Sequence, residues 1–119
     1  MGLNRTIAAI LGVIYLVIGV AGFILTSPLF GLFDVSLLHN VVHVIFGAVL
    51  LWGAMDTANA VLANRWVGIV LLVLGVLGFI VGNSLNFLPL GGYDIWLHLV
   101  SGAILTIVSF MGARTMATA

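Results

Sequence analysis

The chain has 119 residues, of which 64% are hydrophobic and 5% charged, and three arginines balance three aspartates to a net charge of zero. A soluble domain carries about 25% charged residues, so this composition excludes a soluble globular fold and favours an integral membrane protein. The neutral balance gives no basic surface for nucleic acid. The absence of cysteine excludes disulfides, thiolate metal sites and iron–sulfur clusters.

Four apolar segments follow one another along the chain. The first, Thr6–Leu25, is longer than the hydrophobic part of a secretory signal and has no small-x-small cleavage site after it, so we predict a retained transmembrane helix. The others are Ser36–Met55, Ala60–Val81 and Ile95–Met111, each close to the roughly 20 residues that cross a bilayer. Helices satisfy the backbone within lipid. The sequence therefore predicts an all-α membrane protein, a four-transmembrane-helix bundle forming a single domain over residues 1–119.

The second half of the chain resembles the first. Residues 12–24 and 68–80 are identical at eight of 13 positions, and after a one-residue gap His43 and Gly47 align with His98 and Gly102. This pattern predicts two tandem two-helix repeats, at about 6–55 and 60–112. Because each repeat crosses the membrane twice, we expect a pseudo-two-fold axis along the membrane normal.

Glycines recur at spacings of seven and three in the first and third segments, which puts them on one stripe of each helix. Small residues on such a stripe let helix backbones approach closely. The stripes are predicted to be packing seams, with a ligand groove as the alternative. The close-packing candidates, including the two glycines that follow the aligned histidines, are Gly12, Gly19, Gly22, Gly47, Gly68, Gly75, Gly78 and Gly102.

The arginines predict the orientation of the bundle. Arg5, Arg65 and Arg114 all fall on one side of a four-span topology, and the opposite connections contain no basic residue. The positive-inside rule then places both termini in the cytoplasm.

Most of the remaining ionisable and amide side chains gather at the other side. The candidate polar cluster comprises His39, Asn40, His43, Asp94 and His98. Helical residues three or four apart share a face, and ionisable groups at membrane depth are costly and often functional. We expect His43 and His98 to face each other in the outer leaflet, with Asn40 and Asp94 placed to orient the imidazoles. Gly47 and Gly102, four residues after each histidine, would leave space on the same face.

Three uses of this cluster remain open. The first is a structural hydrogen-bond network that holds the second and fourth helices together. The second is a cofactor or metal site: haem b with His43 and His98 as axial ligands, or zinc bound by His39, His43 and His98 with the Asp94 carboxylate. The third is proton or small-molecule handling, since histidine titrates near neutral pH.

Two motifs carry a resemblance to a known family. LHNVVHVIFG, from Leu38 to Gly47, and NFLPLGGYDIWLHLVSG, from Asn86 to Gly102, are similar to the motifs of an uncharacterised family of bacterial four-helix membrane proteins, seen largely in actinobacteria and cyanobacteria. The resemblance covers nearly the whole chain and implies the fold, but no activity or cofactor. It singles out His39, Asn40, His43, Gly47, Asn86, Asp94, Trp96, His98 and Gly102. Ile95 stands where the family usually has asparagine.

These observations favour a non-catalytic membrane protein, a small subunit of a larger membrane complex or a homo-oligomer, whose partner is the lipid bilayer. The resemblance implies a multi-pass protein of the bacterial inner membrane. No acid–base–nucleophile constellation appears beyond the histidines and Asp94, so we do not expect an enzyme. A haem b or metal-binding redox protein is the first alternative, and a proton or small-molecule transport component the second.

Overall fold

The computed structural model describes residues 2–33, 35–85 and 87–118, with side chains up to residue 111. It contains four helices, α1 (Leu3–Ile24), α2 (Leu37–Gly53), α3 (Thr57–Val81) and α4 (Tyr93–Thr118). α1, α3 and the first 19 residues of α4 are long and apolar enough to cross a membrane. α2 has 17 residues, about 25 Å at 1.5 Å per residue, at the short end of the range for a transmembrane helix. The expected all-α membrane bundle is confirmed.

The helix boundaries differ slightly from the apolar segments. α3 begins at Thr57 rather than at residue 60 because Asp56 caps it: the carboxylate accepts a hydrogen bond from the Asn59 backbone N–H at 2.8 Å. α4 continues to Thr118, past the predicted end at Met111. The added segment contains no proline, and two alanines, one arginine and one methionine in it favour a helix regardless of hydropathy.

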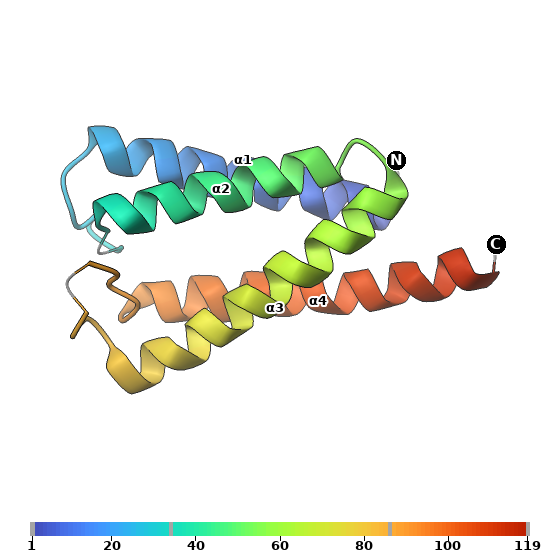
Figure 1. The fold of residues 1–119 in the computed structure, drawn as a ribbon. Helices are drawn as coiled ribbons and strands as arrows, with labels where there is room; N and C mark the ends of the chain where they lie inside the picture. The colour runs from blue at the N-terminus through green and yellow to red at the C-terminus, as the bar shows by residue number, and fades with distance from the viewer. Residues whose placement is uncertain (1, 34, 86, 119) are drawn as a thin grey trace.

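The helices form two antiparallel hairpins, α1 with α2 and α3 with α4 (Figure 1). α3 also contacts α1 and α2, and α1 contacts α4, whereas α2 and α4 make no close backbone approach among the described residues. Both termini and the α2–α3 connection lie at one end, and the other two connections lie at the opposite end (Figure 1). The expected contact between the second and fourth helices is therefore absent at the backbone level. The tandem repeat and its symmetry axis stay predictions from the sequence.

All eight candidate glycines lie in helix interfaces. A Cβ on Gly12, Gly19, Gly22 or Gly47 would press on the facing helix of the α1–α2 hairpin, and one on Gly68, Gly75 or Gly102 would press on that of the α3–α4 hairpin; at Gly78 it would meet α4 and the connection before it. In each hairpin one glycine faces a glycine of the other helix. A Cβ on Gly47 would lie 2.8 Å from the Gly12 carbonyl oxygen, and one on Gly102 would lie 2.9 Å from that of Gly68. Each hairpin is thus held by the close approach of two helix backbones.

The connection between α3 and α4 folds back over the bundle. Gly82 ends α3 with φ +54°, a conformation that favours glycine. Its carbonyl accepts a hydrogen bond from the Leu90 N–H at 3.2 Å, and Asn83 Oδ1 accepts one from the Gly91 N–H at 2.9 Å. These bonds turn the Leu90 side chain inward, where it is buried.

Ser36 ties the start of α2 to this connection. Its hydroxyl accepts a hydrogen bond from the His39 N–H at 3.2 Å, as an N-cap, and donates one to the Phe87 carbonyl at 2.5 Å. The first turn of α2, which carries His39, is therefore fixed to the segment before α4.

Two buried asparagines, Asn4 and Asn64, lie at the end of the bundle that holds the termini. Asn64 on α3 donates to the backbone and side-chain oxygens of Asn4 on α1, both at 3.0 Å, and Asn4 donates to the Val108 carbonyl of α4 at 3.0 Å. Sequence reasoning did not single out these asparagines. They join three helices by amide hydrogen bonds, which suit an apolar interior.

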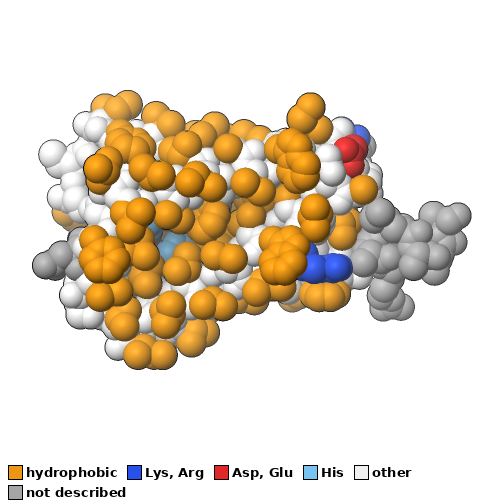
Figure 2. All heavy atoms as spheres, in the orientation of Figure 1, with side chains coloured by type: hydrophobic (Ala, Val, Ile, Leu, Met, Phe, Trp, Pro, Cys, Tyr) orange, Lys and Arg blue, Asp and Glu red, His pale blue; other side chains and the backbone are white. Residues whose placement is uncertain are grey.

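The outer surface is almost entirely apolar. Figure 2 shows hydrophobic side chains over the length of the bundle, with charged side chains at the end that carries the termini. There Arg5 donates to the Ala54 carbonyl at 2.8 Å, and Arg65 donates to the Ser109 carbonyl at 3.2 Å while stacking on Phe110. A surface of this kind is stable in a lipid environment.

Candidate functional site

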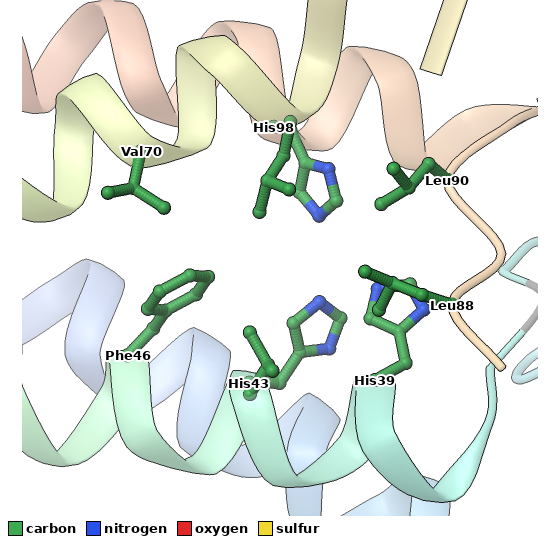
Figure 3. Close-up of a pocket in the computed structure, with 9 residues that line it drawn as sticks. His39, His43, Phe46, Val70, Leu88, Leu90 and His98 are labelled. Atoms are coloured by element: carbon green, nitrogen blue, oxygen red, sulfur yellow. The ribbon is translucent and has the colours of Figure 1, made fainter. Parts of the chain in front are cut away.

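Three imidazoles meet between the two hairpins, near the end opposite the termini (Figure 3). His39 and His43 lie one turn apart on α2, and His98 reaches toward them from α4. The ring centroids are 4.2 Å apart for His39 and His43, and 5.9 Å apart for each of these with His98. One ring nitrogen from each histidine can be chosen so that all three lie within 4.8 Å of one another.

The imidazoles are buried in an apolar interior. The exposed fraction is 0% for His43 and 1% for His39 and for His98. Neither ring nitrogen of His43 or of His98 has a hydrogen-bond partner among the described residues. An unpaired buried polar group costs about 1–3 kcal/mol. The predicted hydrogen-bond network is therefore not seen at these two imidazoles.

A cavity of about 300 Å³ adjoins the three imidazoles, and among the described residues that line it the three histidines are the polar ones. Its apolar lining comes from α2, α3 and the α3–α4 connection: Val42, Phe46, Val70, Leu74, Leu88 and Leu90. In Figure 3 Phe46 and Val70 lie on one side of the imidazoles, and Leu88 and Leu90 on the other. The histidine nitrogens thus face an apolar chamber.

Tyr15 on α1 packs against the histidine cluster. Its ring packs edge-on against His43, with centroids 5.4 Å apart, and its hydroxyl shares a 2.7 Å hydrogen bond with Ser101 of α4. Ser101 also donates to the Leu97 carbonyl at 2.5 Å. This hydroxyl pair is a neighbour of the site that the spacing of the histidines did not indicate.

Asn40 lies on a different face of α2 from the imidazoles. Its side-chain amide sits directly over Gly22 of α1, where a Cβ would collide with it. The expectation that Asn40 orients an imidazole is not met. The helix turns about 100° per residue, so Asn40 points away from His39 and His43 and packs in the seam with α1. Gly47 lies on the same seam, so the space that it opens is filled by α1 rather than adjoining the imidazoles.

Asp94 is fully buried in the first turn of α4, one turn before His98. It lies close enough to Tyr15 for an electrostatic interaction. The carboxylate does not belong to the group of ligand atoms that His39, His43 and His98 bring together, nor to the lining of the cavity. The expected zinc site of three histidines and this carboxylate therefore reduces to the three histidines.

Two other residues carried over from the family resemblance lie elsewhere. Trp96 is 58% exposed and packs edge-on against Phe79, with ring centroids 5.8 Å apart, on the outside of the bundle. Asn86 lies outside the described residues. Gly102 is part of the α3–α4 seam.

The arrangement suits coordination of a small metal ion. Three neutral imidazoles are a common ligand set for zinc, with about 2.0–2.1 Å between metal and nitrogen and one position left for a further ligand. Tetrahedral geometry at that distance separates the nitrogens by roughly 3.4 Å. The observed nitrogens lie within 4.8 Å of one another, so rotations about the histidine side-chain bonds would have to draw them closer to bind one ion.

Comparison with known proteins gives a family and no function. Residues 5–111 match the family described as a domain of unknown function, DUF4383. No curated protein and no solved structure shows significant similarity to the chain.

Proposed function

The chain belongs to the DUF4383 family, and since this family carries no assigned activity, we propose a function from the site itself: an integral membrane protein that binds a divalent transition-metal ion, best matched by zinc, through His39, His43 and His98. The observation that carries the proposal is the convergence of three buried imidazoles from two helices within 4.8 Å. A metal ion would accept lone pairs of His43 and His98, whose ring nitrogens have no hydrogen-bond partner in the part of the chain that the structure describes.

The three-histidine geometry favours a small ion over haem. A haem iron with two axial histidines has all its other positions filled by the porphyrin, so no third imidazole can stand beside the metal. Here His39 lies as close to His98 as His43 does, at 5.9 Å between ring centroids. We therefore rank a metal ion above the haem b alternative that the pairing of His43 and His98 suggested.

Transport and catalysis receive less support from the cavity. Apart from the three histidines, the described part of its lining is apolar. A conducting path needs polar groups along its length, and hydrolysis needs a general base beside the metal-bound water. We infer a binding protein, either as a homo-oligomer or as a small subunit of a membrane complex, in the bacterial inner membrane with both termini in the cytoplasm. The site would then lie in the outer leaflet.

The proposal is tested by metal content and by cobalt spectroscopy on the detergent-purified protein. We expect about one zinc ion per chain after dialysis, and a cobalt-substituted form with the visible absorption of a tetrahedral site. His39→Ala, His43→Ala and His98→Ala should each weaken zinc binding by more than about 100-fold, because a first-sphere ligand matters more than the outer-shell groups that cost 10–100-fold.

Asn64→Leu is the matched control, since it removes a buried polar side chain at the opposite end of the bundle. It should leave zinc affinity unchanged. Folded protein that binds neither zinc nor cobalt, or an affinity that is equal in the wild type and in all three histidine variants, would overturn the proposal.

A further inference from the structure

The cavity beside the imidazoles reaches the outer surface of the bundle at Val70. Val70 lines the cavity and is nevertheless 41% exposed on the surface of α3. In Figure 2 histidine atoms are visible at the bottom of a depression between the two hairpins, surrounded by apolar side chains. In a membrane-spanning bundle this wall faces lipid. A molecule dissolved in the bilayer would therefore approach the cavity from the side, past Val70, and the imidazoles lie buried behind this opening.

The depth of the site matches that of a lipid headgroup boundary. His43 is six residues from the start of α2 and His98 five residues from the start of α4, so they lie roughly 9 Å and 7.5 Å from these helix ends at 1.5 Å per residue. An amphipathic helix that lies in the membrane interface buries its apolar face about 5–10 Å into the boundary between headgroups and acyl chains, so the imidazoles lie at the depth of that boundary. Phe46 and Val70 lie on the far side of the imidazoles from the α3–α4 connection (Figure 3), toward the middle of the bilayer.

Charge balance specifies the headgroup. Three neutral imidazoles leave the two positive charges of a bound divalent ion in place, and an ionised Asp94 carboxylate, buried one turn from His98 but outside the ligand group, would offset one of them. One positive charge remains at membrane depth, where uncompensated charge is strongly unfavourable. A monoanion at the fourth position of the metal makes the whole site neutral.

From these observations, and resting on the metal-binding function proposed above, we infer that the site binds a single-chain, lipid-soluble carboxylic acid, with its carboxylate on the metal and its hydrocarbon chain in the apolar cavity toward Phe46, Val70 and Leu74. A cavity of about 300 Å³ is at the lower limit for small-ligand pockets. It accommodates the first part of one chain, and the rest leaves through the lateral opening. The bound acid would have its carboxylate near the membrane surface and its chain toward the middle of the bilayer, as a free acid has in the outer leaflet.

The experiment uses the cobalt-substituted protein in a nonionic detergent at pH 8, where the acids are ionised. Three probes are titrated while the visible absorption of cobalt is recorded: decanoate, acetate with the same headgroup, and decanol with the same chain length. We expect decanoate to change the spectrum with an apparent Kd at least tenfold below that of acetate, and decanol to leave the spectrum unchanged. Acetate and decanoate of equal affinity would overturn the inference, because the cavity would then play no part. An equal response to decanol would overturn the carboxylate assignment.

Val70→Phe adds bulk inside the cavity and keeps all three histidines, and Val73→Phe adds the same side chain on the lipid-facing side of α3. The first should weaken decanoate at least tenfold and leave acetate unchanged, whereas the second should alter neither. If cobalt binds and decanoate has no effect on its spectrum, the proposal of a carboxylic acid ligand is wrong and the proposal of a metal site is retained. If cobalt does not bind, both proposals fall. The comparison of the three probes on the wild type decides the matter even if Val70→Phe does not fold.

Discussion

His43 and His98 bring four polar ring atoms into an apolar interior where the described residues give them no hydrogen bond. Such groups normally lower stability, since each unpaired buried donor or acceptor costs about 1–3 kcal/mol. Sites that bind a ligand commonly carry a stability cost of this kind. The imidazoles should therefore destabilise the metal-free protein and stabilise the metal-bound one.

His43→Leu separates these two effects. Without metal we expect the variant to unfold with a free energy equal to or about 1–2 kcal/mol above that of the wild type, because an apolar side chain replaces two unpaired polar atoms. With zinc at 100 times its Kd the wild type should gain about 2.7 kcal/mol and the variant should not. The measurement is reversible unfolding in mixed micelles with chelator and with zinc. Asn64→Leu, as control, should lose stability equally in both conditions; a zinc-dependent gain in His43→Leu would contradict the assignment.

The Tyr15–Ser101 hydrogen bond gives a second prediction. Tyr15→Phe removes the hydroxyl but keeps the ring that packs against His43, and Ser101 retains its bond to the Leu97 carbonyl. We expect a loss of about 0.5–1.5 kcal/mol in the free energy of unfolding and a zinc affinity within about threefold of the wild type. Tyr93→Phe, at an exposed position, is the control and should change neither. A loss of zinc binding comparable to that of His43→Ala would mean that the hydroxyl takes part in the site.

Each hairpin depends on glycines that allow two helix backbones to touch. In α2 the seam with α1 runs through Asn40, Val44, Gly47 and Leu51, whereas the adjacent stripe of His39, His43 and Phe46 faces the other hairpin. Close approach at the seam fixes the rotation of α2 about its axis. That rotation in turn directs the imidazoles toward His98.

Gly47→Ala tests this coupling. The added Cβ would lie 2.6 Å from the Leu16 backbone nitrogen and 2.8 Å from the Gly12 carbonyl oxygen, and neither backbone atom can move aside cheaply. We expect the free energy of unfolding to fall by about 1–3 kcal/mol, as for overpacked cores, and the zinc Kd to rise because α2 is displaced. The control is Gly2→Ala, where no atom lies within 4 Å of the new Cβ. It should stay within about 0.5 kcal/mol of the wild type. If Gly47→Ala were as stable as the wild type, the helices at this seam would lie farther apart than the Cβ distances of 2.6 and 2.8 Å indicate.

The helices and their seams could be predicted from the sequence because they follow from one-dimensional patterns. Hydropathy gives four segments, and the recurrence of glycine marks the faces that pack. The spacing of His39 and His43 likewise puts both on one side of α2. The structure adds what such patterns do not contain. Asn40 turns to α1, Asp94 stays outside the ligand group, and Leu90 lines the cavity from the connection just before α4. These depend on helix rotation and loop path, which tertiary packing decides.

For the molecule as a whole, the bundle has two chemically distinct ends beneath one apolar surface. One end has the termini, the arginine contacts with Ala54 and Ser109, and the amide bonds of Asn4 and Asn64. The other has the three imidazoles and the folded-back connection before α4 (Figure 1). Arginines concentrate on the cytoplasmic side of membrane proteins, so the histidine end is expected outside the cytoplasm, where it would meet metal ions and lipids of the outer leaflet.

Cysteine labelling in cells tests this orientation, and the chain suits the method because it contains no cysteine of its own. Ser84→Cys places a thiol in the exposed connection at the histidine end, and Ala58→Cys places one at the exposed start of α3 at the other end. With a membrane-impermeant maleimide on intact spheroplasts we expect labelling of Ser84→Cys alone. After permeabilisation both should be labelled, which controls for access to the thiol. Labelling of Ala58→Cys alone in intact spheroplasts would invert the bundle and place the imidazoles in the cytoplasmic leaflet. The expected orientation is inferred from the arginines. That outcome would therefore also mean that the contacts of Arg5 and Arg65 stabilise the packing of the helices and do not determine the orientation of the bundle.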